Sequence, residues 1–149
     1  VYSDQKTKWD QNDPSEMINT NELSGRVRVA YGSYTAAGEQ SDIHMFNLPN
    51  NSRILSGSVS HVALGSGTTI SVGHAAYTDS SGTAVSLDVD EFKASAASTG
   101  VVTVAIVATV VLGLGTVVDA NEDGYPVTVS LAGGAGTGKI ELLMTYVVD

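Results

Sequence analysis

The chain has 149 residues, no cysteine, and 7 basic against 16 acidic side chains, which give a formal net charge of −9. This length suggests one domain with a substantial core, and the lack of cysteine excludes disulfides and Cys-ligated metal centres. The acidic balance argues against nucleic acid as a partner, because binding to phosphates needs clustered Lys and Arg.

The first 24 residues form a segment of their own. They show neither the 3.6-residue period of a helix nor the 2-residue period of a strand, and a frayed tail is one interpretation. The segment nevertheless carries apolar side chains that are costly to leave in water: Tyr2, Trp9, Met17 and Ile18. We therefore predict an extended N-terminal arm at 1–24, with these four residues as contacts to a partner, and a β-sandwich domain at 25–149.

Period-two alternation begins at residue 25. Val27, Val29 and Tyr31 fall on one face, with Arg26 and Arg28 on the other, which indicates a half-buried strand. Further strands are expected where apolar runs are bounded by Gly, Pro and Asn turns. These expected strands cover 41–48, 53–64, 68–73, 85–89, 101–112, 116–118, 127–131 and 140–148. A short helical turn is the weaker expectation for 91–97.

Residues 94–118 contain no charged side chain, so a membrane span is the alternative to strands there. Val and Thr dominate 101–111, Gly113 and Gly115 interrupt the apolar run, and no basic cluster or aromatic belt flanks it. This composition favours a strand buried on both faces, followed by a glycine turn. No contact with a membrane is expected.

Residues 133–139 read GGAGTGK, which fits the G-x-x-x-x-G-K core of a phosphate-binding loop. The next residue, Ile140, cannot supply the hydroxyl that binds magnesium, and the alternation beyond it predicts a strand where a helix is required. We interpret the segment as a glycine-rich hairpin loop between the last two strands.

Residues 119–124 read DANEDG and match the first half of a calcium loop, D-x-[DN]-x-[DN]-G. The twelfth position should be a bidentate glutamate but is Ser130, and strands are expected on both sides. A solvated acidic turn is the preferred interpretation, and a weak non-helical calcium site is the alternative.

Three carboxylates at 88, 90 and 91 are candidates for an acid–base pair. Asp88 and Asp90 share one strand face, about 6 to 7 Å apart by strand rise, and nothing else in the sequence supports catalysis. The three histidines lie on different segments and are interpreted as exposed or hydrogen-bonded structural residues: His44, His61 and His74. No nucleophile motif occurs, so we predict no catalytic residue, cofactor or metal site, and expect no enzymatic activity.

Many short strands separated by Gly and Asn turns indicate an all-β protein. An antiparallel jelly-roll-like sandwich of about eight strands is the expected architecture, because the jelly roll is the common eight-strand arrangement that limits exposed edges.

Four segments carry a family resemblance: VAYGSYT at 29–35, FNLPNNSRIL at 46–55, LGSGTTISVG at 64–73, and VTVSLAGGAGTGKIELLMTYVV at 127–148. Their order resembles that of the jelly-roll capsid decoration, or cement, proteins of tailed phages. The resemblance covers roughly residues 26 to 149. It brings no catalytic residues with it.

The resemblance implies a structural virion protein, made in the host cytoplasm and located on the outer surface of the capsid. There it would bind the major capsid protein and stabilise contacts between capsid subunits, commonly as a homotrimer at three-fold positions. One alternative is a carbohydrate-binding head-fibre or tail-spike module, for which one Trp, two Phe and six Tyr are a small supply of aromatic platforms. A small hydrolase is the other, and it lacks a visible nucleophile or paired acid.

Overall fold

The structure is a computed structural model that describes residues 26–107 and 113–148. The arm expected at 1–24, with Tyr2, Trp9, Met17 and Ile18, lies outside the described residues. The described residues contain ten strands and no helix. The strands are β1 (Val27–Glu39), β2 (Asp42–Leu48), β3 (Ser52–His61), β4 (Thr69–His74), β5 (Tyr77–Thr78), β6 (Ala84–Val85), β7 (Asp88–Ala97), β8 (Val102–Ile106), β9 (Tyr125–Ala132) and β10 (Gly136–Val148).

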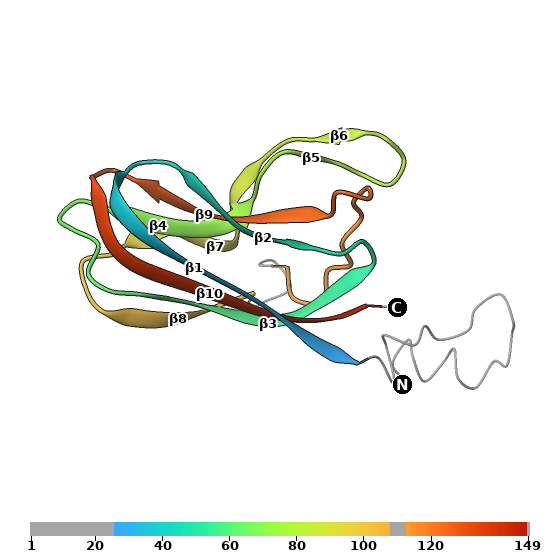
Figure 1. Cartoon of the computed structure of the whole chain (residues 1–149), viewed down its shortest axis with the longest axis horizontal. Coiled ribbons are helices and arrows are strands. Elements are labelled where there is room, and N and C mark those ends of the chain that lie inside the picture. The colour runs from blue at the N-terminus through green and yellow to red at the C-terminus, as the bar shows by residue number, and fades with distance from the viewer. Residues whose placement is uncertain (1–25, 108–112, 149) are drawn as a thin grey trace, which may run out of the picture.

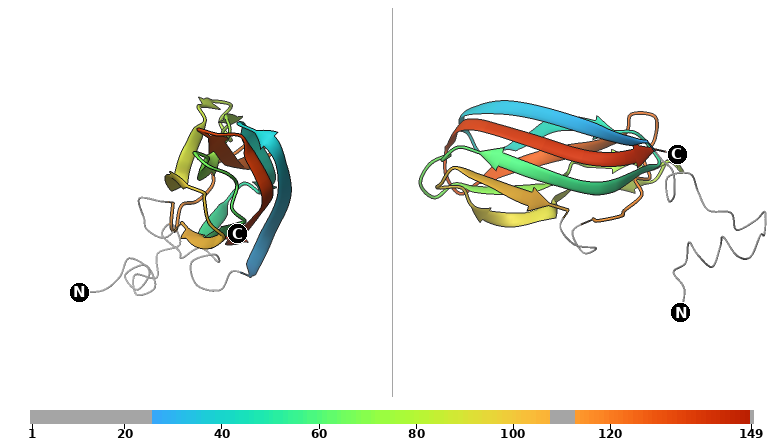
Figure 2. Two further views of the ribbon diagram at one scale, coloured as in Figure 1. Left: turned by 90° about the vertical axis from the view of Figure 1, so that its left-hand side faces the viewer. Right: turned by 90° about the horizontal axis from the view of Figure 1, so that it is seen from below.

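Eight of these strands form two four-stranded antiparallel sheets that stack face to face (Figure 1). The first sheet has the order β1-β10-β3-β8 and the second the order β2-β9-β4-β7; the strands of the first lie side by side in Figure 2. The pairing is nested, since β1 pairs with β10, β2 with β9, β3 with β8 and β4 with β7. Nested antiparallel pairing of this kind is the topology of a jelly roll, and the predicted fold class is confirmed.

The core lies between the two sheets and follows the expected alternation. In β10, Ile140, Leu142 and Met144 are fully buried and alternate with more exposed residues. The same core cluster contains large side chains of both sheets: Leu48, Ile54, Ile70, Val72, Phe92, Ile106, Val127 and Val129. Burying each such side chain stabilises the fold by roughly 1.5 to 3 kcal/mol, so the core supplies most of the stabilisation.

The helical turn expected at 91–97 is wrong, because β7 continues through these residues and pairs with β4. The register of this pair shifts between Ile70 and Val72, where β7 carries one extra residue. The Lys93 ammonium lies at this bulge and donates hydrogen bonds to the carbonyls of Ile70 at 3.0 Å and Ala94 at 3.1 Å. Sheet pairing and this buried lysine therefore outweigh the weak local pattern.

The strand expected at 101–112 is found as β8 at an edge of the first sheet, and residues 108–112 lie outside the described part. Thr103 and Ala105 are exposed, whereas Ile106 is buried. The expectation of burial on both faces is therefore wrong, because the second sheet covers only one face of β8. Within the described ranges, no helix has the length and apolar character needed to cross a membrane.

The first strand alternates as expected, but the predicted burial of its apolar face is wrong. Val27 and Val29 are each 58% exposed and Tyr31 is 56% exposed, and Arg28 is exposed as well. The even-numbered residues face the second sheet, and the first of them to be fully buried is Ala36. At the beginning of β1, both faces of the strand are thus open to solvent.

Candidate functional site

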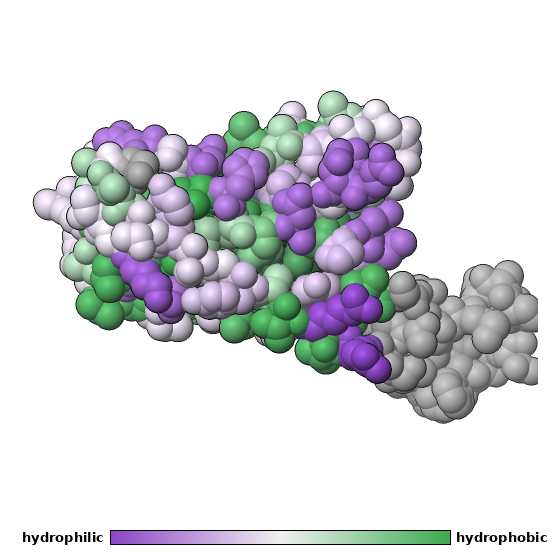
Figure 3. Space-filling model, viewed as in Figure 1, coloured by the Kyte–Doolittle hydropathy of each residue, from purple (hydrophilic) through white to green (hydrophobic). Residues whose placement is uncertain are grey.

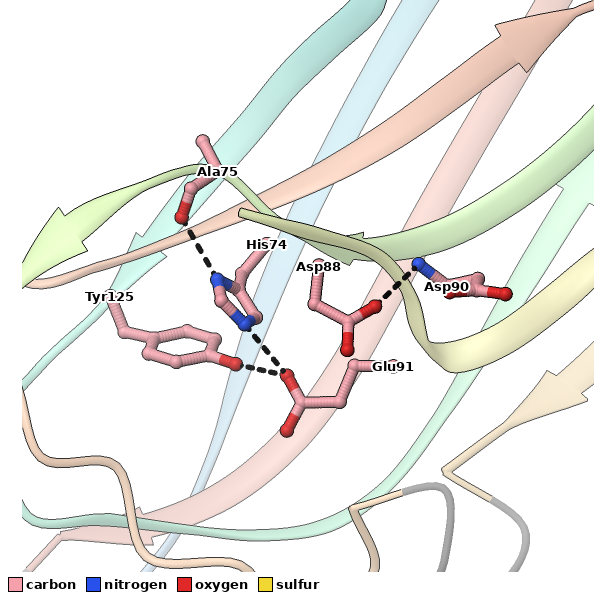
Figure 4. Close-up of polar contacts among 6 residues, drawn as sticks. All are labelled: His74, Ala75, Asp88, Asp90, Glu91 and Tyr125. Carbon is pink, nitrogen blue, oxygen red and sulfur yellow. Dashed lines mark hydrogen bonds and ion pairs between the residues drawn. The ribbon is translucent and has the colours of Figure 1, made fainter. Parts of the chain in front are cut away.

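A polar cluster joins the second sheet to the β5–β6 hairpin (Figure 4). Tyr125, the first residue of β9, donates a hydrogen bond from its hydroxyl to Oε2 of Glu91 in β7. Nε2 of His74, the last residue of β4, lies 3.4 Å from the same carboxylate oxygen. Tyr77 completes the cluster, with its ring centroid 5.3 Å from that of His74 and 4.9 Å from that of Tyr125.

The protonation of His74 is constrained by its neighbours. Nδ1 lies 2.9 Å from the carbonyl oxygen of Ala75, which only accepts, so Nδ1 must carry a proton. A second proton on Nε2 then gives an ion pair with Glu91. Without it, Nε2 and the carboxylate face each other as two acceptors unless the carboxyl is protonated.

Burial shapes the electrostatics of the two tyrosines. Burial, followed by the charge of Glu91, raises the pKa of the Tyr125 hydroxyl above its ordinary value and also raises the pKa of Tyr77. Both hydroxyls therefore stay protonated near neutral pH, where Tyr125 acts as a donor. Since His74 and Tyr125 are buried and both contact Glu91, we interpret the cluster as a structural link between β4, β7 and β9.

The acidic pair considered from the sequence is solvated. Asp88 and Asp90 are both exposed, and Oδ1 of Asp88 accepts the backbone N–H of Asp90 at 3.1 Å. Glu91, their neighbour, instead takes part in the polar cluster. No local pattern predicts its contacts, because His74 and Tyr125 come from other strands, β4 and β9.

The histidines do not form a cluster. His44 is exposed on β2, whereas His61 and His74 are buried. Each buried ring places Nδ1 2.9 Å from the carbonyl of the following residue. Their interpretation as exposed or hydrogen-bonded residues is confirmed, although the contact of His74 with Glu91 was not anticipated.

The segment that resembles a phosphate-binding loop continues into a strand, as expected. Lys139 lies on β10 with its Nζ 2.6 Å from Glu141, and Ile140 is fully buried. The predicted hairpin is wrong, because β9 and β10 belong to different sheets and the loop crosses between them. Gly133 adopts φ 82°, and a Cβ there would meet the Gly67 carbonyl oxygen at 2.4 Å, so its glycine is required by backbone packing.

The segment that resembles half a calcium loop is an acidic turn. Asn121 and Asp123 bond to each other, since Asn121 Oδ1 accepts the N–H of Asp123 at 3.0 Å. Oδ1 of Asp119 points elsewhere and accepts the N–H of Ser80 at 3.1 Å. The carboxylates thus stabilise turns in place of converging on one point.

The neighbouring β5–β6 turn is built the same way. Oδ1 of Asp79 accepts hydrogen bonds from Ser81 and from the N–H of Thr83. These bonds lower the pKa of the Asp79 carboxyl below its ordinary value. The hydrophilic side chains at the upper right of Figure 3 lie in this part of the molecule, around β5 and β6.

The exposed start of β1 is the other candidate surface. In Figure 3, apolar and hydrophilic side chains adjoin each other at the lower right, where β1 begins. Tyr31 lies opposite Leu143 of β10, which is 37% exposed, and donates its hydroxyl to Glu141 at 2.9 Å. The four predicted partner contacts, Tyr2, Trp9, Met17 and Ile18, lie outside the described residues.

Neither the family models nor the curated proteins compared with the chain match it. Solved structures that contain a similar chain include three capsids. The structure described as "Capsid of Ralstonia phage GP4" matches with a TM-score of 0.61 and 20% sequence identity, and the match covers 89% of this chain and 91% of that chain. The structure described as "Cyanophage Pam1 capsid asymmetric unit" matches with a TM-score of 0.58 and 18% identity, and the match covers 85% of this chain and 88% of that chain. The third, "Acidic stable capsid structure of Helicobacter pylori bacteriophage KHP30", matches with a TM-score of 0.55 and 13% identity, and the match covers 82% of this chain and 87% of that chain. At these identities the similarity shows a shared fold.

Proposed function

We propose that this protein is a non-enzymatic structural component of a phage virion, which binds the outer surface of the capsid and stabilises contacts between major capsid subunits. The observation that carries the proposal is the likeness of nearly the whole sandwich to single chains of three phage capsid structures. The resemblance of the sequence segments to decoration proteins supports the same role.

Two candidate contact surfaces on the chain support this role. A clamp gains affinity when several modest contacts act together through effective concentration. The exposed start of β1 supplies one contact surface, and we propose residues 1–24 as a second, with Tyr2, Trp9, Met17 and Ile18 as anchors. Aromatic anchors of this kind often dominate the binding energy of an interface. The protein would act as a homotrimer at three-fold positions, where equivalent sites favour a partner of the same symmetry.

Co-sedimentation tests the function. Purified protein is mixed with capsids that lack decoration, and the bound fraction is measured against protein concentration. Saturable binding at a fixed number of copies per capsid is expected, and a symmetry-free reconstruction of the decorated capsid should show three copies together on the outer surface. Binding that never saturates, or density only inside the shell, would contradict the proposal.

A further inference from the structure

The charged side chains are unevenly distributed over the sandwich. The first sheet and the residue before it carry the exposed arginines at positions 26 and 28, the half-buried Arg53 and the exposed Lys139. On this sheet, Glu141 is held by Lys139 at 2.6 Å, and Glu39 is the last residue of β1. The start of β1 is therefore a basic surface on an acidic protein.

The second sheet and its loops have the opposite character. Their carboxylates are Asp42, Asp79, Asp88, Asp90, Glu91, Asp119, Glu122 and Asp123. Within the strands of this sheet, the lysine is Lys93, which is buried and donates hydrogen bonds to two carbonyls. Exposed Asp88 and Asp90 thus lie on an acidic surface at the start of β7, next to Leu87, which is 54% exposed.

Two surfaces of opposite charge therefore each carry exposed apolar residues. We call the first the β1 patch, which lies along the open edge of the strand and consists of Arg26 and Arg28 on one face and Val27, Val29 and Tyr31 on the other. We call the second the β7 patch, consisting of Leu87, Asp88 and Asp90. The Arg28 and Asp90 side chains are both exposed, so both are available to a molecule that covers them.

The two patches lie on diagonally opposite edges of the sandwich. β1 is an edge strand of the first sheet and lies next to β2, since a Cβ on Gly32 would meet the Met45 carbonyl oxygen at 3.0 Å. β7 is the far edge of the second sheet and lies next to the end of β8, where Val107 N–H donates to the Phe92 carbonyl at 3.1 Å. The patches of one molecule thus face apart and are placed to meet those of other molecules.

We propose that the β1 patch binds the β7 patch of a second copy of this chain. Such a contact is head-to-tail, and repeated head-to-tail contacts close into a ring or extend into a chain. The proposal deepens the proposed function by naming the surfaces that join the copies. Opposite charge fixes the register of the contact, while Val27, Val29 and Tyr31 pack around Leu87 of the neighbour.

Charge exchange tests the pairing in the full chain. The association constant is measured by sedimentation equilibrium for the wild type, Arg28→Glu, Asp90→Arg and the double variant. Each single variant places like charges together and should weaken association about tenfold or more, and the double variant should recover most of the loss. Glu122→Arg is the matched control, because it makes the same charge reversal on another loop and should leave association close to that of the wild type.

The results separate this proposal from the capsid role. Loss in both single variants with recovery in the double variant supports the head-to-tail contact. A wild type that is monomeric at its highest soluble concentration overturns it, as does a double variant no better than the singles. If Arg28→Glu weakens only capsid binding, the β1 patch meets a capsid subunit, and the proposed function stands without this inference. Circular dichroism of each variant confirms that the sandwich is folded.

Discussion

A single hydroxyl connects two strands in the polar cluster, since Tyr125 of β9 donates to Glu91 of β7. Replacing Tyr125 with Phe keeps the ring in the core and removes the bond. We expect the free energy of unfolding to fall by about 1 to 2 kcal/mol, as for a hydrogen bond to a charged acceptor that is partly solvated. Urea unfolding at pH 7 measures the change. Tyr31→Phe is the control, because exposed Tyr31 also donates to a glutamate and should change stability less.

The raised pKa of Tyr125 also predicts a dependence on pH. Burial and Glu91 favour the protonated hydroxyl in the folded state, so its contribution is fully present below the unfolded pKa, about 10, and is lost as pH rises toward the folded pKa. The wild type should therefore lose stability more steeply above pH 10 than Tyr125→Phe does. Thermal melts between pH 9 and 11 measure both slopes, and parallel slopes would contradict the assignment.

The buried lysine is a second test at this scale. Burial lowers the pKa of Lys93, and its ammonium bonds to the carbonyls of Ile70 and Ala94. Lys93→Met should lower the free energy of unfolding by about 2 kcal/mol, because both carbonyls lose their donor. Lys139→Met makes the same change at an exposed site and should unfold like the wild type.

The segment that resembles a phosphate-binding loop is tested separately. Lys139→Ala should leave capsid binding unchanged, and calorimetry of the wild type with ATP and magnesium should show no heat of binding.

Among the elements, β4 and β7 approach each other closely at Gly73. A Cβ at this position would lie 2.0 Å from the Asp88 carbonyl oxygen, which is backbone and cannot move aside cheaply. We expect Gly73→Ala to destabilise the fold by about 3 kcal/mol or to prevent folding. Gly100→Ala is the matched control, since its nearest neighbour would be a Val102 methyl at 3.8 Å. Equal melting temperatures for the two variants would show that the strands tolerate separation.

The sequence predicted the strands better than it predicted their burial. Period-two alternation identified most of the eight sheet strands, because alternation follows from strand geometry. It did not predict that β9 is buried from Tyr125 to Leu131 while the valine-rich β8 has an open face. That difference depends on position in the sheet, since β9 is central and β8 is at an edge. Position is set by the nested pairing, which no local pattern encodes.

The candidate sites show the same limit. The motif at 119–124 forms the expected acidic turn, and the segment at 133–139 continues into the expected strand, although it crosses between the sheets where a hairpin was predicted. The contact of His74 with Glu91 was missed, since it joins residues that pair only after β4 and β7 are adjacent. The exposure of Val27 and Val29 was missed for a related reason: alternation shows that a strand has two faces but does not show which face meets the second sheet.

For the whole molecule, the central prediction concerns residues 1–24. Deleting them should leave the isolated sandwich folded, with its circular dichroism and melting temperature nearly unchanged, because the strands of the two sheets bury a continuous core between them. Capsid affinity should fall sharply. Trp9→Ala alone should reproduce part of the loss, on the order of 2 kcal/mol for a central anchor.

The same deletion separates two binding modes. If the truncated protein still saturates capsids with unchanged affinity, the segment is passive and binding resides on the sandwich. Arg28→Glu then becomes the informative variant, since it alters the sandwich without touching residues 1–24.

The position of β10 between β1 and β3 has a consequence for the time course of folding. Its pairing with β1 joins residues more than 100 positions apart, such as Val27 and Val147. Proteins dominated by such distant contacts fold slowly, in roughly milliseconds to seconds. During translation, β1 and β3 lack the strand that separates them until β10 has been made, so the first sheet forms late and its strand edges stay open to aggregation until then. The surface at the start of β1 therefore becomes competent for assembly only as one of the last steps of biosynthesis.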